Sequence, residues 1–331
     1  MSSYAPAWVK RDRQRFPRAE LSGGKPIESL SAFSQANLDA DRRAFAALMR
    51  QLRVLDGKAR TVVMVQVENE VGLVNEPMDR SALAKKAWSD PVPAALVAHL
   101  ASRRESLAPE VATAWRKAGG QLSGTWQNLF GNSPAAEELF TAWHYARYVD
   151  EVAKAGKAEY ALAMYVNAAL NRPGHRPGQY PSGGPVPHLI GVWKVAAPTI
   201  DLIAPDVYFG RLDEWTAFYQ RRDNALFVPE IKNDEAVAVH ALFAFGQGAI
   251  GFSPFTIEAT EGKPASELAR VYGWLRALGP SAAPAWVSCW TASTRRERWC
   301  WANTPCRSAT TTPSRGRHWP TRMRPGRRRG A

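Results

Sequence analysis

Apolar runs of strand length alternate along the chain with longer segments in which apolar residues recur every three or four positions. This alternation predicts parallel strands joined by amphipathic helices that cover a buried sheet. The expected strands lie at residues 61–72, 160–168, 199–209, 224–232 and 248–255. The expected helices lie at about residues 35–55, 135–155, 234–245 and 267–278, with a helix-like segment at 212–222. The fold class is therefore expected to be α/β.

Two α/β architectures fit this order of elements: a doubly wound open sheet and a (β/α)8 TIM barrel. No glycine-rich phosphate loop follows any of the expected strands, which lowers the case for a nucleotide-binding doubly wound sheet. Polar residues instead stand at the ends of the strands. In a barrel every strand end opens onto one face, where active sites lie, so the pattern favours the barrel.

The sequence predicts only five strands, whereas a complete barrel has eight. The first sixty residues show no strand signal, and residues 1–30 are polar and interrupted by three prolines. We therefore expect residues 1–280 to form a partial catalytic domain with about strands four to eight, the first three being absent. An open barrel exposes two strand edges, so we expect the chain alone to be poorly soluble and inactive.

The C-terminal segment, residues 281–331, differs in composition from the rest of the chain. Within it, residues 287–331 hold eleven Arg and one acidic residue, so most of the net charge of +13 resides there. They contain four Trp but no Leu, Ile, Phe or Tyr, which argues against a packed core. One interpretation is a disordered basic arm that binds polyanions. We favour an aberrant, out-of-frame C-terminus, and therefore expect no nucleic-acid partner.

Three further expectations concern the environment of the protein. No apolar run is long enough to span a membrane and the start lacks the apolar core of a signal peptide, so the chain as written is expected in the cytoplasm without a membrane partner. The six His show no metal-ligand spacing, and the three Cys, all in the C-terminal segment, match no zinc pattern. We expect no metal and no other cofactor, and the oligomeric state stays open.

Two carboxylates stand at the ends of buried strands. Glu70 follows an apolar run in TVVMVQVENEVG, and Glu230 ends the apolar run of LFVPEIK. Burying a carboxylate costs several kcal/mol of free energy unless the group is paired with a cation, hydrogen-bonded or protonated. Taken singly, a carboxylate at a strand end often caps the next helix or pairs with Arg. Taken together, two carboxyl groups on facing strand ends provide the acid and the nucleophile of retaining glycoside hydrolysis, one protonated and one ionised.

The stretch MVQVENEVG resembles the acid/base motif of the glycoside hydrolase family 35 β-galactosidases, and the related family 42 shares its Asn-Glu. The similarity runs from about Ser3 to about Leu278 and includes WHYARYVDEVAKAGKAEY, IDLIAPDVYF and LFVPEIK. It resembles most the subgroup with an added C-terminal domain of unknown function. The resemblance implies a TIM-barrel retaining β-galactosidase whose substrate is a β-galactoside or an oligosaccharide. Another retaining β-glycosidase of the same clan, or a non-catalytic carbohydrate-binding remnant, stays an open alternative.

The resemblance also implies roles for individual residues. Glu70 would be the acid/base, and Asn69 would hydrogen-bond the sugar 2-hydroxyl. Glu230, on the presumed seventh strand, would be the nucleophile. Tyr208, ending the presumed sixth strand, would lie near Glu230 and hold its ionised form; the alternative for Tyr208 is an aromatic side chain that packs on the rim of the barrel.

Three further residues are weaker candidates. Asn167 ends the expected strand 160–168, where it would either touch the sugar or merely terminate the strand. Trp126 lies in a loop expected to overhang the barrel mouth, where it would either stack on a sugar or belong to a local core. Glu68 shares one side of its strand with Glu70 by the period of two. We expect Glu68 to belong to a buried network rather than to tune Glu70.

Overall fold

The computed structural model describes residues 5–282, with side chains described as far as Ala277. The chain divides into two units, Met1–Ala277 and Leu278–Ala331. Nearly all of the second unit lies outside the described residues. The expectation for residues 281–331 therefore stays a prediction, and so does the domain boundary near residue 280. The sheet and the helices that carry the candidate site belong to the first unit.

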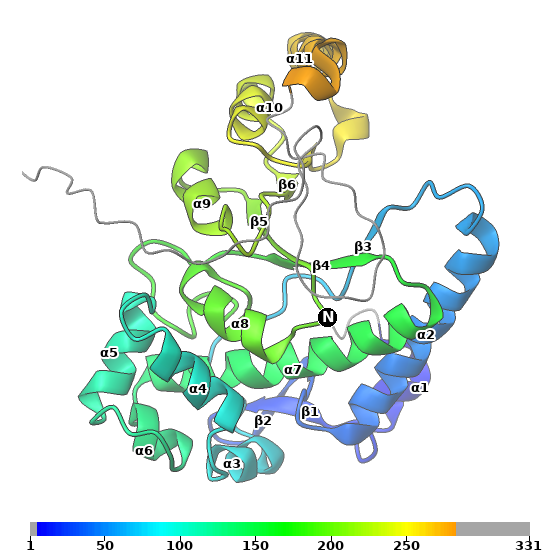
Figure 1. Cartoon of the computed structure of the whole chain (residues 1–331). Helices are drawn as coiled ribbons and strands as arrows, with labels where there is room; N and C mark the ends of the chain where they lie inside the picture. Colours follow the sequence, from blue (N-terminus) through cyan, green and yellow to red (C-terminus); the bar gives the residue numbers. More distant parts are fainter. Residues whose placement is uncertain (1–4, 283–331) are drawn as a thin grey trace, which may run out of the picture. The chain divides into compact units, whose positions relative to one another are not determined.

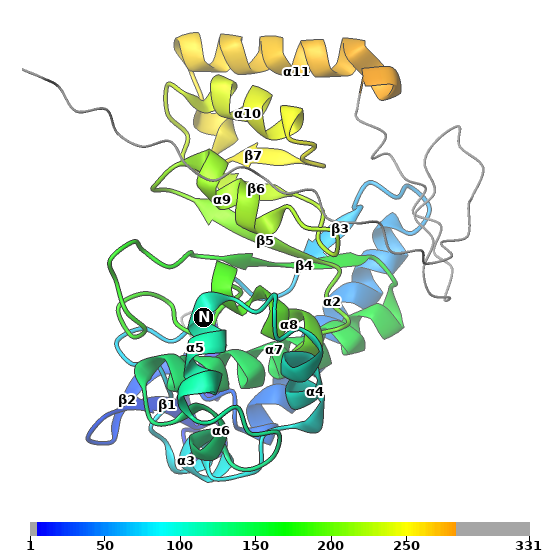
Figure 2. The same cartoon turned by 60° about the vertical axis from the view of Figure 1, so that its left-hand side comes forward.

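A five-stranded parallel sheet runs through the first unit, with its strands in the sequential order β3-β4-β5-β6-β7 (Figures 1 and 2). The strands are β3 (Met64–Gln66), β4 (Ala163–Ala168), β5 (Leu202–Val207), β6 (Val228–Ile231) and β7 (Phe252–Pro254). Each lies within one of the five expected runs, so these strand predictions are confirmed. Sequential parallel neighbours are the order of a (β/α)8 barrel, whereas a doubly wound sheet reverses direction at a switch point. The fold is an incomplete (β/α)8 barrel with about strands four to eight.

The register of the strands decides which side chains share a face of this sheet. Asn167 on β4 pairs with Ala204 on β5, and Asp206 on β5 pairs with Glu230 on β6. Side chains two residues apart on one strand point to the same side, as do paired residues on neighbouring strands. Asn167, Asp206 and Glu230 therefore lie on one face, at the carboxyl end of the sheet.

Helices connect the strands and pack around the sheet (Figure 1). They are α1 (Ala7–Arg11), α2 (Gln35–Asp56), α3 (Ala82–Trp88), α4 (Ala94–Ser102), α5 (Pro109–Lys117), α6 (Trp126–Phe130), α7 (Pro134–Glu159), α8 (Ile190–Ala196), α9 (Leu212–Tyr219), α10 (Val237–Gly246) and α11 (Gly262–Ala282). The expected helices match α2, α7, α9, α10 and α11, with ends that differ by a few residues. Among residues 5–282, no helix combines the length and the apolar character needed to cross a membrane.

The expectation that no strand precedes residue 61 is wrong. Strands β1 (Arg18–Leu21) and β2 (Lys25–Leu30) form an antiparallel hairpin (Figure 2). Gly23 and Gly24 make its turn with φ of 81° and 75°, a left-handed backbone that glycine adopts without strain. The sequence signal was weak because β2 has no fully buried residue, so no alternation of apolar and polar positions marks it.

The long region after β3 also holds helices that the sequence did not reveal. Helices α3, α4, α5 and α6 are only 7, 9, 9 and 5 residues long, too short for a helical period to stand out. The short helix α8 likewise follows a segment rich in Pro and Gly. Their stability comes from tertiary packing, since Trp88, Trp115 and Trp126 on these helices are all buried.

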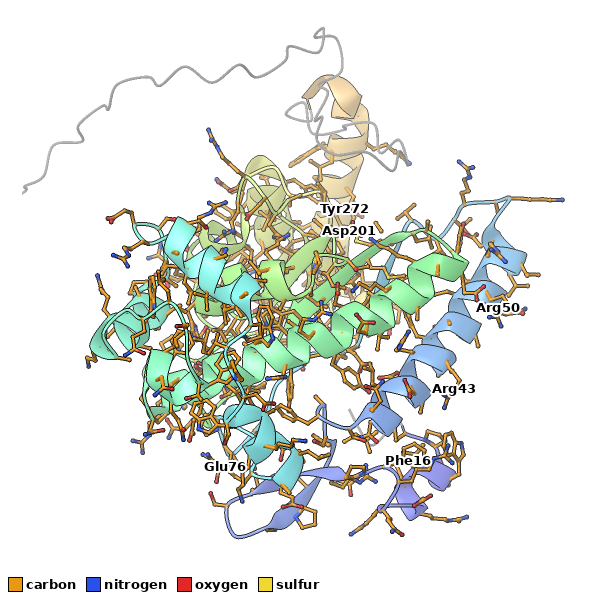
Figure 3. All side chains as sticks on the ribbon, turned by 60° about the horizontal axis from the view of Figure 1, so that its bottom comes forward. Phe16, Arg43, Arg50, Glu76, Asp201 and Tyr272 are labelled. Atoms are coloured by element: carbon orange, nitrogen blue, oxygen red, sulfur yellow. The ribbon has the colours of Figure 1, made fainter. Side chains whose placement is uncertain are left out.

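The long helices α2 and α7 lie side by side, as Figure 3 shows. Gly156 on α7 allows this approach, because a Cβ atom there would lie 2.3 Å from Cε1 of Phe45 on α2. At the end of α7, Lys157 Nζ pairs with Asp201 Oδ2 at 2.6 Å, and the same oxygen accepts a hydrogen bond from the Met164 backbone at 2.7 Å. These contacts attach α7 to the beginnings of β4 and β5.

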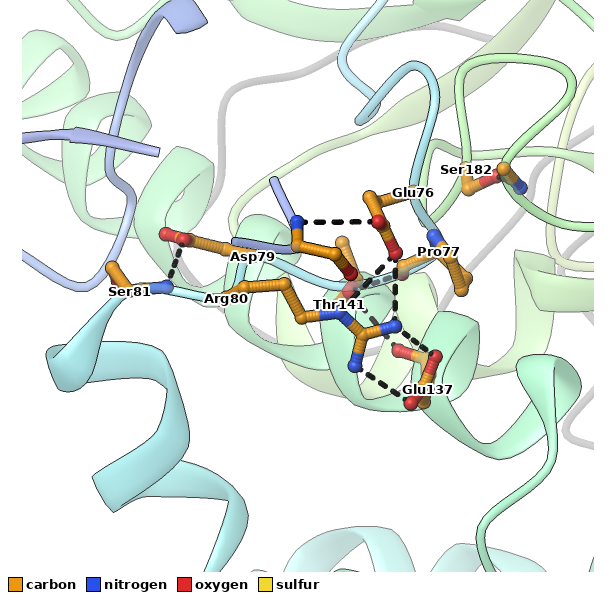
Figure 4. A network of polar contacts seen from close by, with 10 residues as sticks. Glu76, Pro77, Asp79, Arg80, Ser81, Glu137, Thr141 and Ser182 are labelled. Atoms are coloured by element: carbon orange, nitrogen blue, oxygen red, sulfur yellow. Dashed lines mark hydrogen bonds and ion pairs between the residues drawn. The ribbon is translucent and has the colours of Figure 1, made fainter. Parts of the chain in front are cut away.

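An ion-pair network attaches the loop after β3 to α7 (Figure 4). Arg80 Nη1 and Nη2 donate to the two carboxylate oxygens of Glu137, both at 2.7 Å, and Nη2 also pairs with Glu76 at 3.0 Å. Next to it, Asp79 Oδ1 accepts a hydrogen bond from the backbone of Glu20 on β1 at 3.0 Å. The loop thereby connects the hairpin to α7.

Candidate active site

Glu70 lies on a short turn that leaves the end of β3. Val67 and Val71 are buried on either side of this turn, and Glu68, Asn69 and Glu70 between them are more exposed. The backbones of Glu68 and Glu70 adopt φ of 60° and 44°. A residue other than glycine in this left-handed region costs on the order of 1–3 kcal/mol. Such strain persists only where neighbouring groups hold the backbone in place.

The side chain of Asn167 is the main such group. Its Oδ1 accepts a hydrogen bond from the Glu70 backbone N–H at 2.9 Å, and its Nδ2 donates to Asn69 Oδ1 at 2.9 Å and to Asp206 Oδ2 at 2.6 Å. Gln66 Nε2 also donates to Asn69 Oδ1 at 2.9 Å. Asn167 is 2% exposed, so it offers no surface to a sugar here. Its amide is engaged with the protein and holds the turn.

Glu230 and Tyr208 lie together, as the sequence predicted. Glu230 is on β6, and Tyr208 directly follows β5. The Tyr208 hydroxyl donates a hydrogen bond to Glu230 Oε1. Tyr208 is 40% exposed, and its ring meets that of Phe255 edge to face, with the centroids 6.1 Å apart. Tyr208 therefore supplies a hydrogen-bond donor to Glu230 at the carboxyl end of the sheet.

Asp206 is a member of this site that the sequence analysis missed. It is 1% exposed and lies next to Glu230 across the β5–β6 pairing. A signal was present, because the period of two places Asp206 on the same side of β5 as Tyr208, within an otherwise apolar run. A charged residue inside a fully buried strand is itself unusual.

The three carboxyl groups at this end of the sheet influence one another. Burial, together with the negative charge of Glu230, raises the pKa of Glu70 above its usual value. Burial and the charges of Glu230 and Glu70 raise the pKa of Asp206 to about 8. The same surroundings raise the pKa of Tyr165, which lies on β4 beside them, to about 12. Glu70 and Asp206 therefore hold their protons more tightly than ordinary carboxyl groups.

Glu68 points to a different place from Glu70. The alternation of a strand ends at Gln66, so the expectation that Glu68 and Glu70 share one side does not hold. Glu68 lines a cavity of about 340 Å³ between α1, β2, α2 and α7. Burial and the nearby charge of Asp41 raise its pKa well above the usual value, and the Tyr148 hydroxyl donates to Asp41 at 3.1 Å. Glu68 thus belongs to a buried network.

Trp126 does not join the candidate site. It begins α6, is 1% exposed, and packs against Trp88, Phe130 and Phe140, with centroids 5.2–6.5 Å apart. Its ring has no free face on which a sugar could stack, so the expectation that it binds substrate is wrong. Trp126 is a core residue because the short helices after β3 need a large apolar side chain between them and α7.

The residues 5–277 contain no group of three or more His, Asp and Glu side chains arranged to hold a metal ion. This includes the three carboxyl groups of the candidate site.

No protein-family model matches the chain, and no curated protein sequence matches it. Among solved structures, its fold resembles the catalytic domain of β-amylase from Paenibacillus polymyxa, with a TM-score of 0.50 and 12% sequence identity over 80% of this chain and 76% of that chain. A likeness at this level of identity defines the fold and not the activity. The fold class is therefore an incomplete (β/α)8 barrel, with acidic residues at the carboxyl ends of its strands.

Proposed function

We propose that the site belongs to a retaining β-glycosidase that acts on terminal β-galactosides, and that the carboxyl groups brought together here give this chain the activity that its open barrel led us not to expect. The observation that carries this proposal is the unequal environment of two carboxyl groups at one end of the sheet. Burial and the charge of Glu230 raise the pKa of Glu70 and so favour its protonated form. Glu230, in contrast, accepts a hydrogen bond from the Tyr208 hydroxyl. An acid and a nucleophile need two carboxyl groups in different surroundings.

The proposed reaction is a double displacement. The Glu230 carboxylate attacks the anomeric carbon while the bond to the leaving oxygen breaks, and Glu70 gives its proton to that oxygen. Glu70, now ionised, takes a proton from water as the water oxygen attacks the anomeric carbon and the bond between that carbon and Glu230 breaks. Both carboxyl groups return to their first states and the product keeps the β configuration.

The sugar preference in this proposal rests on the resemblance of MVQVENEVG to family 35 β-galactosidases. The exposed side chain of Asn69 beside Glu70 is available to the sugar 2-hydroxyl. The fold that the chain shares with a glycoside hydrolase catalytic domain supports carbohydrate as the substrate class. Another β-glycoside as the preferred substrate is the runner-up.

A mechanism-based label tests the nucleophile without requiring turnover. The full chain is incubated with 2,4-dinitrophenyl 2-deoxy-2-fluoro-β-galactoside, whose leaving group departs without an acid. We expect one fluorogalactosyl group per chain by intact mass, located on Glu230 by peptide mapping. Glu230→Gln should abolish the label and Glu70→Gln should retain it. A label on another residue, or a folded wild-type chain without any label, would overturn the proposal.

The acid/base is tested with a glycoside whose leaving group needs protonation. On a methyl or 4-methoxyphenyl β-galactoside, Glu70→Gln should lower the rate by about 10²–10⁴-fold, the usual contribution of a general acid. With Glu70→Ala and added azide, the product should be the β-galactosyl azide. The α-azide, or a loss below about tenfold, contradicts the assignment of Glu70. The same fluorinated label built on glucose or xylose identifies the runner-up if it reacts faster than the galactose compound.

A further inference from the structure

Asp206 has no role in the double displacement described above, yet it is the most deeply placed of the three carboxyl groups. It is fully buried, whereas Glu70 and Glu230 are both partly exposed. One of its oxygens, Oδ2, accepts the 2.6 Å hydrogen bond from Asn167. The other, Oδ1, is buried, and the carboxyl groups of Asp206 and Glu70 also interact directly through a side-chain hydrogen bond. A buried carboxyl costs free energy, so its presence calls for a physical reason.

The bonds of Asn167 supply that reason. The amide group of an asparagine carries an acceptor oxygen on one side and a donor nitrogen on the other, and it can face either way. A carboxyl oxygen that accepts from Asn167 requires the nitrogen on the side of Asp206. The oxygen Oδ1 of Asn167 must then face the turn, where it accepts from the Glu70 backbone N–H at 2.9 Å.

The opposite orientation of Asn167 would bring its oxygen against the Asp206 carboxyl and its nitrogen against the Glu70 N–H. Both contacts are unfavourable, since the first places two acceptors next to each other and the second places two donors next to each other. The left-handed backbone of Glu70 and the 2.9 Å bond to Asn69 both depend on the observed orientation. The hydrogen bond between Asp206 and Asn167 thus affects Glu70 and Asn69, because the same Asn167 amide group bonds both of them.

We propose that Asp206 is a positioning residue for Glu70: it fixes the orientation of the Asn167 amide, which holds the turn that carries Asn69 and Glu70. This inference rests on the proposed function, because it assigns Asp206 to a reaction in which Glu70 is the acid/base. The raised pKa of Asp206 agrees with the role. A protonated Asp206 keeps this role when its proton is on Oδ1, because Oδ2 then still accepts from Asn167 and no third negative charge is added beside Glu70 and Glu230.

The positioning is first tested without any substrate. Amide hydrogen exchange of Glu70, followed by NMR in the full chain, reports the bond to Asn167 Oδ1. Asp206→Ala and Asn167→Ala should speed the exchange at least tenfold. Asp206→Asn keeps an oxygen that accepts from Asn167 and should stay within threefold of wild type. Asp213→Ala, on the exposed side of α9, is the matched control. Unchanged protection of Glu70 in Asp206→Ala, with circular dichroism showing a folded chain, overturns the inference.

The second readout compares two substrates in the same variants. A misplaced Glu70 should lower the rate on a methyl galactoside at least 30-fold, whereas labelling of Glu230 by the dinitrophenyl fluoroglycoside should change less than fivefold. An Asp206 that only supports the fold would lower both equally, and that result also overturns the inference. If the wild-type chain takes no label, the proposed function fails, and the exchange of the Glu70 amide still decides whether Asp206 holds the turn.

Discussion

The Tyr208 hydroxyl donates a hydrogen bond to Glu230, joining the residue after β5 to β6 at the carboxyl end of the sheet. The bond connects a partly exposed aromatic ring to a carboxylate whose other neighbours, Glu70 and Asp206, are also acidic. Without a donor, three acidic groups in one place would repel one another. Tyr208 therefore supplies a hydrogen-bond donor at a place where the neighbouring side chains are acidic.

Removing that donor should weaken the nucleophile. In Tyr208→Phe, the lost hydrogen bond to a charged group corresponds to about 1.5–3 kcal/mol, or about a 10- to 100-fold slower labelling of Glu230 by the fluoroglycoside. Tyr272→Phe is the matched control, since its hydroxyl bonds the Phe252 carbonyl at 3.1 Å, away from the carboxylates. Equal labelling rates in the two variants would show that Tyr208 is only a rim aromatic.

The pKa of Asp206 has a consequence for stability. Folding raises it from 3.8 to about 8, so between these values the folded chain holds a proton that the unfolded chain releases. Stability must then fall as the pH rises through this window and level off above it. The Asp206→Asn variant has no group that titrates at this position, so its stability should not fall in this way as the pH rises. Relative to wild type, its Tm should rise by at least about 2 °C between pH 5 and pH 9, as measured by thermal denaturation. Parallel curves for the two proteins would contradict the raised pKa.

The packing of α2 on α7 predicts an unusual effect of adding a methyl group. Within a helix, alanine is ordinarily more stable than glycine by about 1 kcal/mol. In Gly156→Ala, however, the new Cβ would lie 2.3 Å from Phe45 Cε1. The two helices must separate, which should cost about 1–3 kcal/mol. Gly273→Ala on α11, where no atom lies within 4 Å, is the control and should stabilise the chain. Urea denaturation measures both, and a stabilising Gly156→Ala would contradict the observed packing.

The Arg80 network should matter more than the ion pairs on the surface. Arg80→Ala leaves Glu137 and Glu76 facing each other, both largely buried, and should cost about 2 kcal/mol. Arg211→Ala removes an exposed pair with Asp213 and should leave the stability nearly unchanged. Chemical denaturation in low and high salt separates the two cases. Equal losses, or an Arg80 effect abolished by salt, would mean that the network is a surface feature.

Much of the barrel could be predicted from the sequence, because strands buried on both faces leave continuous apolar runs. All five strands of the sheet and the helices α2, α7, α9, α10 and α11 were visible in this way. The hairpin β1–β2 and the short helices α3–α6 were not. These elements are exposed or too short to show a regular spacing of apolar residues. Tertiary contacts, such as those of Asp79 and the buried tryptophans, hold them in place.

The sequence by itself determined that Glu70, Tyr208 and Glu230 stand at the ends of buried strands, since an acidic or polar residue after an apolar run is a local pattern. Only the tertiary structure decided that Asp206 and Asn167 connect them, that Glu68 turns away, and that Trp126 is core. These outcomes depend on strand register and on left-handed backbone at Glu68 and Glu70. Register and backbone strain are set by groups distant in the chain, and no local period records them.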